Sequence, residues 1–443
     1  MKLFGKILVV AAGFLSFAAH SVHSAPSDVF FPIMPWNEVP NDRATIDKIK
    51  ECGFTIAGFV SPSGLETCRK AGIKAIVSDP RINGFDWATL DAATARQKAL
   101  PAIVAVRKNP ALYGYFLADE PGAGAFPGLA VMTQLVNHTV PEKPAYVNLF
   151  PNYAGPDQMG VDSYDKYLDK FASTVHPAWL CYDHYALMDD GSLGGGYWAN
   201  LMEMRATARK YNLPFWNIIL ALGHFRFRIP TADDLRFEVY SSLACGARGI
   251  VYYSYFAYKV GNYRGAAVDQ FGHETPTWGN VQNINLQIQK LASTLLKLTS
   301  DNVYHFGEVP PGSYGPDTNS LISGMDGDYA VGDFTHADGT RYVMVVNENL
   351  RTSAPCLPRF RHTPKSVEFI SPYTGKAEPF EGEQTWLAPG GGVLLKLLNA
   401  EGTASNRHRL SDGELCTSSV TDNGRPGFSV TFAASRKHVV AEY

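Results

Sequence analysis

The order of the predicted elements indicates an α/β fold with a parallel sheet. Short apolar runs rich in β-branched and aromatic residues alternate with helical segments across residues 29–298. The alternation repeats eight times, and a barrel of eight parallel strands and eight helices takes about 250 residues. After about residue 302 the helical pattern gives way to short strands and turns. The sequence therefore predicts a (β/α)8 TIM barrel followed by a small all-β sandwich domain.

Apolar composition predicts the strands, and the helical spacing of apolar residues predicts the helices. Residues that favour helix ends add to this: Asn41 and Thr231 are predicted N-caps, and Gly72 is predicted to end a helix. The predicted strands cover residues 29–36, 55–60, 74–79, 112–119, 145–149, 179–185, 214–222 and 249–256. The predicted helices cover residues 42–52, 63–71, 88–107 (interrupted at Pro101), 129–138, 163–174, 197–211, 231–244 and 281–298. A doubly wound open sheet is the rival fold. It is disfavoured because no Gly-rich phosphate loop follows the first strand.

Four segments follow from these patterns. Residues 1–25 combine Lys2 and Lys6 with an apolar run and small residues, which is the layout of a secretory signal peptide. We expect the barrel over residues 26–301 and the β-sandwich over residues 302–398, where strands are predicted at 342–347, 366–370 and 392–397. Residues 399–443 are polar and turn-rich, and we expect partial disorder there. The protein should therefore be secreted or periplasmic, with no membrane segment beyond the signal peptide.

Charge and cysteine usage narrow the function further. The chain has 39 Lys and Arg against 42 Asp and Glu, a formal charge of −3, with no long basic run. This balance argues against a nucleic-acid partner. The six cysteines show no CxxC spacing, so no zinc site is predicted, and no cofactor motif is present. We expect neither a metal nor a cofactor.

Polar and aromatic side chains gather at the predicted C-terminal ends of the strands, where barrel enzymes have their active sites. Glu120 and Asp183 are the candidate catalytic carboxylates. The candidate substrate-binding residues are Trp36, Asp79, Asp119, Asn148, His184, Tyr185, His224, Tyr253 and Tyr255. This mixture suits glycoside cleavage, which needs a protonated acid and an ionised carboxylate around a sugar held by hydrogen bonds and aromatic faces.

One stretch carries a family resemblance. The run YGYFLADEP at residues 113–121 resembles the fourth-strand signature of clan A glycoside hydrolases, and particularly of proteins near glycoside hydrolase family 42. The run ACGARGIVYY at 244–253 is similar to the eighth-strand entry of those barrels, and the helix containing NINLQI at 283–288 supports the likeness. At the level of architecture the resemblance covers residues 29–300. It implies that Glu120 is the acid/base residue.

The chain departs from that family at two strand ends. Asp119 stands where clan A has asparagine, and the seventh-strand run at 215–224 contains no carboxylate where the family has its nucleophile. Three accounts remain open. Asp183 could supply the second carboxylate, and a wide gap to Glu120 would then predict inversion. Asp119 could act beside Glu120, although adjacent strand residues normally face opposite sides. Lastly, the barrel could bind sugar without cleaving it.

The sequence thus predicts a secreted glycoside hydrolase acting on a poly- or oligosaccharide. Glu120 would protonate the glycosidic oxygen, with its pKa raised by burial or by Asp119, while Asp183 stays charged as base or nucleophile. The alternatives are a non-catalytic carbohydrate-binding protein on a degenerate barrel and a metal-dependent hydrolase using His184, His224 and Asp183. Structural roles are also open: Glu120 could pair with Arg248, and Asp183 could merely orient His184.

Overall fold

The computed structural model describes residues 30–398 and four short strands beyond them. The predicted signal peptide lies outside the described residues, as do the parts of residues 399–443 that lie between and beyond those strands. The four strands β19 (Arg407–Arg409), β20 (Leu415–Val420), β21 (Pro426–Thr431) and β22 (Val439–Ala441) pair in antiparallel order. None of the helices in the described residues combines the length and the apolar composition needed to cross a membrane.

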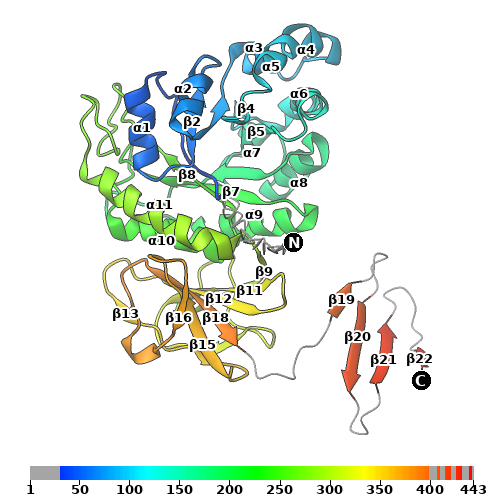
Figure 1. The fold of residues 1–443 in the computed structure, drawn as a ribbon, viewed down its shortest axis with the longest axis vertical. Coiled ribbons are helices and arrows are strands. Elements are labelled where there is room, and N and C mark those ends of the chain that lie inside the picture. The colour runs from blue at the N-terminus through cyan, green and yellow to red at the C-terminus, as the bar shows by residue number, and fades with distance from the viewer. Residues whose placement is uncertain (1–29, 399–406, 410–414, 421–425, 432–438, 442–443) are drawn as a thin grey trace, which may run out of the picture.

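Eight parallel strands form the first domain (Figure 1). They lie in two four-stranded sheets: β1 (Ile33–Pro35), β8 (Gly249–Tyr253), β7 (Phe215–Leu220) and β6 (Leu180–Asp183), then β2 (Ile56–Val60), β3 (Lys74–Val77), β4 (Leu112–Asp119) and β5 (Ala145–Asn148). Single parallel bridges, Glu38 with Phe59 and Leu149 with Tyr182, connect the two sheets at both edges. The domain is therefore α/β and TIM-barrel-like, in agreement with the predicted strand order.

Helices cover the outside of these strands (Figure 1). They are α1 (Arg43–Glu51), α2 (Gly64–Ala71), α3 (Pro80–Asn83), α4 (Ala92–Lys98), α5 (Leu100–Val106), α6 (Phe126–Thr139), α7 (Pro156–Met159), α8 (Tyr164–Val175), α9 (Tyr197–Tyr211), α10 (Ala232–Ala244) and α11 (Pro276–Leu295). The Thr231 cap is confirmed, since its hydroxyl accepts a hydrogen bond from the N–H of Asp234 at 3.2 Å. The cap of α1 is Asp42 rather than the predicted Asn41. The predicted helix 88–107 is two helices, because Pro101 begins a new first turn in α5.

Aromatic side chains fill the space enclosed by the strands. Trp179 and Trp216 stack at 4.4 Å, and Trp36 meets Phe59 and Phe116 edge to face at 4.8 and 5.6 Å. Such large, rigid rings leave little room for the strand ends above them to shift. The five cysteines within residues 30–398 are all buried free thiols: Cys52, Cys68, Cys181, Cys245 and Cys356.

The second domain is built on an antiparallel sheet. Its order is β16 (Ala377–Pro379), β15 (Ser366–Ile370), β18 (Gly392–Leu398), β12 (Arg341–Asn347), β11 (Tyr329–His336) and β9 (Leu298–Phe306). Two ribbons accompany it: β10 (Ile322–Gly324) with β14 (Arg359–Phe360), and β13 (Ala354–Pro355) with β17 (Trp386–Leu387). The three strands predicted for this region are confirmed as β12, β15 and β18.

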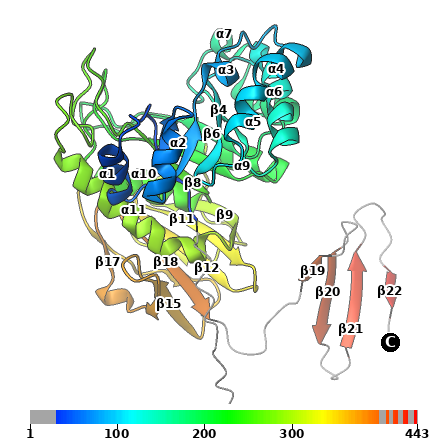
Figure 2. The same cartoon turned by 45° about the horizontal axis from the view of Figure 1, so that its top comes forward.

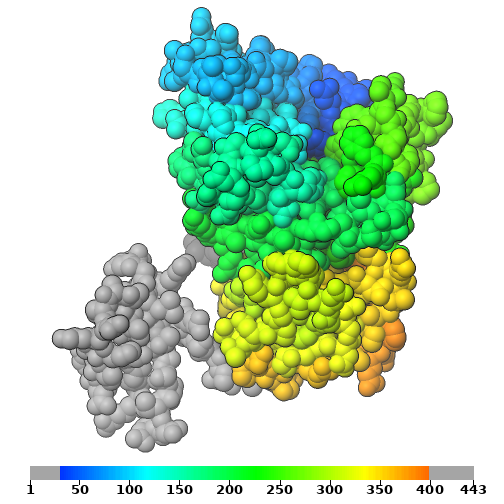
Figure 3. All heavy atoms as spheres, turned by 180° about the vertical axis from the view of Figure 1, so that it is seen from behind, coloured from blue at the N-terminus to red at the C-terminus, as the bar shows by residue number. Residues whose placement is uncertain are grey.

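The two domains pack directly against each other (Figures 2 and 3). Helix α10 lies between them, with contacts to β7 on one side and to β11, β12 and β18 on the other. The packing is close enough to require glycine at position 332 of β11, where an added Cβ would lie 2.1 Å from the carbonyl oxygen of Ala244. The antiparallel sheet therefore packs against the α/β domain through α10, away from the strand ends described next.

Candidate active site

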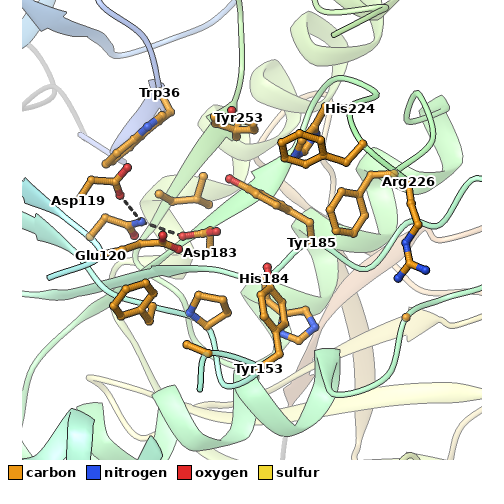
Figure 4. A pocket seen from close by; sticks show the side chains of 18 of the residues that line it. Trp36, Asp119, Glu120, Tyr153, Asp183, His184, Tyr185, His224, Arg226 and Tyr253 are labelled. Carbon is orange, nitrogen blue, oxygen red and sulfur yellow. Dashed lines mark hydrogen bonds between the residues drawn. The ribbon is translucent and has the colours of Figure 1, made fainter. Parts of the chain in front are cut away.

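A cavity of about 660 Å³ opens at the C-terminal ends of the parallel strands (Figure 4). Its lining comes from the ends of β1 and β4 to β8 and from the loops that follow them. The lining residues are Trp36, Asp119, Glu120, Asn148, Phe150, Pro151, Tyr153, Ala154, Gln158, Asp183, His184, Tyr185, Met188, Gly194, Gly195, Ile218, His224, Phe225, Arg226, Phe227 and Tyr253. Most residues predicted for the site are therefore brought together in one place.

Three carboxylates surround the amide of Asn148 at one side of the cavity. The amide nitrogen of Asn148 donates to Asp119 Oδ1 at 3.0 Å and to Asp183 Oδ1 at 2.8 Å. Asn148 is only 2% exposed, so its position is fixed by the surrounding protein. Figure 4 shows the Glu120 carboxyl beside that of Asp183. The ends of β4, β5 and β6 thus contribute one polar cluster.

Glu120 enters the cavity because the backbone changes course at the end of β4. Asp119 is the last residue of the strand, and the N–H of Glu120 still donates to the carbonyl of Asn148 at 2.9 Å. Glu120 itself has a φ of +45°, a left-handed conformation that costs a non-glycine residue free energy and is concentrated at functional sites. Both Asp119 and Glu120 therefore line the cavity. The rule that adjacent residues face opposite sides does not hold here, because Glu120 no longer has strand geometry.

The environment raises the pKa of each carboxyl group. Burial, and then the charge of Asp119, raise the pKa of Glu120 to about 7. Burial raises the pKa of Asp183 well above its ordinary value, and the neighbouring Glu120 charge adds to this, while the hydrogen bond from Asn148 opposes it. The cavity walls also raise the pKa of Asp119. A cluster with this many raised pKa values retains a proton near neutral pH.

The two histidines are electrically neutral at neutral pH. Burial lowers the pKa of His224 to about 4 and also lowers that of His184, whose Nδ1 lies 3.1 Å from Asn200 Oδ1. His184 is thus held by Asn200 and not by Asp183. No group of three or more metal-binding side chains is found in the described part of the chain.

Aromatic rings form much of the remaining wall. The rings of Tyr185 and Tyr253 stack at 5.3 Å, and Trp36 lies at the carboxylate side (Figure 4). Tyr153 and Phe225 also line the cavity with largely exposed rings. Tyr153, Phe225 and Arg226 were not predicted from the sequence, because they stand in irregular loops rather than at strand ends. Their closeness in sequence to the ends of strands five and seven was the available signal.

The structure corrects the expected position of two residues. Asp79 lies outside the cavity lining: its carboxylate caps α3 by accepting from the N–H of Arg81 at 2.9 Å and pairs with the Arg81 guanidinium at 2.6 Å. Tyr255 also lies outside it, buried against Phe54, and its hydroxyl accepts from Trp278 Nε1 at 3.1 Å. Both follow strands as predicted, but local partners turn them away.

The seventh strand has no carboxylate of its own, as the sequence shows. Glu238 of α10 approaches it from outside, accepting a hydrogen bond from the Leu220 N–H at 3.2 Å. Glu238 is 1% exposed and does not line the cavity. The suggested pairing of Glu120 with Arg248 is wrong, because the Arg248 guanidinium donates to the carbonyls of Leu295 and Leu298.

Comparison with known proteins is informative only at the level of structure. No family model and no curated protein matches the sequence. A glycoside hydrolase family 5 protein from Bacteroides vulgatus is similar at 13% identity and a TM-score of 0.52, covering 84% of this chain and 89% of that one. A second structure, described as a glycoside hydrolase, matches at 12% identity and a TM-score of 0.54, covering 84% and 93%.

A β-galactosidase from the psychrophilic Marinomonas ef1 matches at 8% identity and a TM-score of 0.46, and this chain spans 60% of its length. The expected nearness to family 42 stays a prediction. At these identities the first two likenesses show the fold, which is an α/β TIM-barrel-like domain of the kind that glycoside hydrolases use.

Proposed function

We propose that the protein is a glycoside hydrolase that cleaves O-glycosidic bonds of a poly- or oligosaccharide. The observation that carries this proposal is the cluster of Asp119, Glu120 and Asp183 around Asn148, in an aromatic-walled cavity at the strand ends. A sugar needs both kinds of surface, because its ring faces stack on aromatics and its hydroxyls bond to polar groups. The glycoside hydrolase structures that share this fold add support.

Glu120 acts as the general acid in this proposal. A pKa of about 7 leaves much of it protonated near neutral pH, which is what protonation of a leaving oxygen requires. Asp183 is the charged partner in this proposal: burial raises its pKa, and the hydrogen bond from Asn148 opposes that rise by stabilising the carboxylate. The proposal therefore requires the pair to hold one proton, on Glu120, when the bond is cleaved.

Asp183 lies on β6 and Glu120 follows β4, so one strand, β5, lies between the two strands that carry the proposed catalytic groups. With a gap wide enough for a water molecule, Asp183 would act as a base and the product anomer would be inverted. Cleavage of a defined oligosaccharide, with the first-formed anomer followed by NMR, distinguishes inversion from retention.

We also propose that the protein is exported. Determining whether the mature chain begins after residue 25 tests this proposal.

The decisive experiment compares Glu120→Gln with the wild type on a polysaccharide panel. We expect kcat to fall about 10³-fold or more because the proton donor is lost, while sugar binding and thermal stability stay close to wild type. Glu142→Gln, an exposed carboxylate outside the cavity, is the matched control and should be fully active. Undiminished hydrolysis by Glu120→Gln would refute the assignment.

A non-catalytic sugar-binding protein is the second candidate, favoured by the absence of a carboxylate on β7. The same panel separates the two functions. Binding of an oligosaccharide without any cleavage by the wild type would support the binding protein.

A further inference from the structure

A tight hairpin follows β7 and carries two side chains into the cavity wall. The N–H of Phe227 donates to the carbonyl of His224 at 2.8 Å, and the N–H of His224 donates back to Phe227 at 3.2 Å. Phe225 and Arg226 form the tip of this hairpin and line the cavity. The ring of Phe225 is left in the open, since the residue is 67% exposed.

Phe225 is held in a conformation that phenylalanine rarely adopts. Its φ is +44°, in the left-handed region that glycine or asparagine would occupy more easily. The side chain of Asn262 holds it there: Oδ1 accepts from the Phe225 N–H at 2.7 Å, and Nδ2 donates to the Phe225 carbonyl at 2.9 Å. The Phe225 ring contacts His224 at 5.1 Å and Tyr263 at 6.3 Å but stays largely exposed, which leaves it free to stack against a ligand.

Arg226 adds a charge to this tip. Of the side chains that line the cavity in the described part of the chain, Arg226 alone is permanently cationic, since His184 and His224 stay neutral. Nearby arginines are committed to carboxylates: Arg228 pairs with Asp234 and Arg264 with Asp189. No ion pair within 4 Å involving Arg226 is found in the residues that the structure describes, although its charge adds to the side-chain and backbone hydrogen bonds that lower the pKa of the nearby Asp190 carboxylate.

The cavity therefore has two ends of opposite charge. Figure 4 shows the carboxylates of Asp119, Glu120 and Asp183 on one side and the guanidinium of Arg226 on the other, with Tyr185 between them. An anionic substituent would be repelled at the first end and bound at the second. Arginine recognises carboxylate and sulfate groups through its planar fork of N–H donors.

We infer that the substrate is an acidic saccharide, in which a sugar unit away from the cleaved bond stacks on Phe225 while its carboxylate or sulfate ester pairs with Arg226. This inference rests on the proposed function of the same cavity. It adds the substrate class, and it assigns recognition to the hairpin after β7. The residues that recognise the acidic group, Phe225 and Arg226, are distinct from the carboxylates proposed to cleave the bond.

Binding to the Glu120→Gln variant tests the inference without requiring turnover. Titration calorimetry compares uronate oligosaccharides with their carboxyl-reduced forms, and sulfated oligosaccharides with their desulfated forms. We expect one acidic form to bind at least tenfold more tightly than its neutral counterpart, and the pair that responds identifies the anionic group. If neither acidic form is preferred, the inference is overturned.

Substitutions at Arg226 and Phe225, made in the same background, assign the effect to the hairpin. Arg226→Gln should abolish the preference for the acidic form and leave affinity for the neutral form unchanged, and Arg226→Lys should restore part of it. Phe225→Asn keeps a residue that tolerates the left-handed backbone and should weaken both forms. Arg96→Gln, an exposed cation outside the cavity, is the matched charge control.

The outcomes separate this inference from the proposed function. An enzyme that loses hydrolysis through Glu120→Gln, but whose Arg226→Gln variant keeps the acidic preference, would remain a hydrolase with the inference refuted. An acidic preference that depends on Arg226 in a protein that cleaves none of these glycans would refute the hydrolase and keep the substrate class.

Discussion

The ends of β4 and β7 face each other across the cavity and differ in almost every respect. At β4 the chain presents Asp119 and Glu120, supported from below by buried Asn148. At β7 it presents no carboxylate, and the strand continues into the Phe225–Arg226 hairpin. Both ends carry a left-handed residue, Glu120 at +45° and Phe225 at +44°. In the proposed function, the strained backbone at Glu120 positions a general acid and the strained backbone at Phe225 positions a ring for stacking.

In the proposed function, β4 and β6 carry the chemistry and the hairpin after β7 carries the recognition of the saccharide. The carboxylate of Asp183 on β6 lies deep and that of Glu120 is half-buried, and desolvation raises the pKa of both, whereas the β7 hairpin is exposed. Changes at the first end should lower kcat, while changes at the second should raise KM. The substitutions below test that separation, from the largest expected effect to the smallest.

Asp183→Asn should give the largest loss in this series. Removing the ionised partner of Glu120 is expected to lower kcat by about 10³-fold, in the range of lost acid–base catalysis, with KM nearly unchanged. Steady-state kinetics on the best substrate of the panel measures this. Activity within tenfold of wild type would show that Asp183 on β6 is not the second catalytic group.

Asn262→Ala should weaken saccharide binding by the Phe225–Arg226 hairpin, although Asn262 itself does not line the cavity. Loss of the two hydrogen bonds to Phe225 frees the hairpin tip, so we expect KM to rise about fivefold to tenfold while kcat stays near wild type, as for a lost ground-state contact. Thermal melting under the same conditions should be little changed. An equal fall in kcat and kcat/KM would show that the hairpin takes part in the transition state.

Asp119→Asn should change the pH profile more than the rate at the optimum. The Asp119 charge helps to raise the pKa of Glu120, so its removal lowers that pKa. A general acid works only while protonated, and the wild type should therefore lose activity as pH rises through about 7. In the variant the same decline should begin at lower pH. A basic limb that stays in place would mean that Glu120 is not the group that titrates.

Glu238→Gln should leave activity intact and alter stability alone. Burial raises the pKa of Glu238 well above its ordinary value, so the folded state holds a proton that the unfolded state releases. Stability is then lost as pH rises above the unfolded pKa of about 4.3. The neutral amide removes this dependence and should stabilise the protein by about 1 kcal/mol at pH 8 and by little at pH 4. Melting at the two pH values measures this change, and an equal effect of the substitution at pH 4 and pH 8 would contradict the assigned proton on Glu238.

The sequence predicted the fold where its patterns were regular. Eight apolar runs, each followed by a helix, were enough to locate the parallel strands, and the carboxylates at 119, 120 and 183 came from reading strand ends. Helix ends were less predictable. The last helix begins at Pro276 and gives way to β9 by Leu298, because an apolar stretch of that kind suits a strand as well as a helix turn.

The failures concern geometry that no local pattern encodes. Period-two alternation predicted that only one of Asp119 and Glu120 would face the cavity, but the left-handed turn at Glu120 admits both. Asp79 and Tyr255 were placed by the same strand-end rule, and their partners Arg81 and Trp278 turned them aside. Arg226 was missed because it stands in an irregular loop, and only the three-dimensional structure shows that this loop lines the cavity.

Helix α10 has a mechanical consequence for the whole molecule. It contributes side chains to the core beneath β7 and to the core above β11 and β12, so neither layer is complete without it. Disturbing one layer removes support from the other, which couples the two domains into a single cooperative unit of unfolding. The carboxylate cluster thus depends for its rigidity on an antiparallel sheet that it never touches.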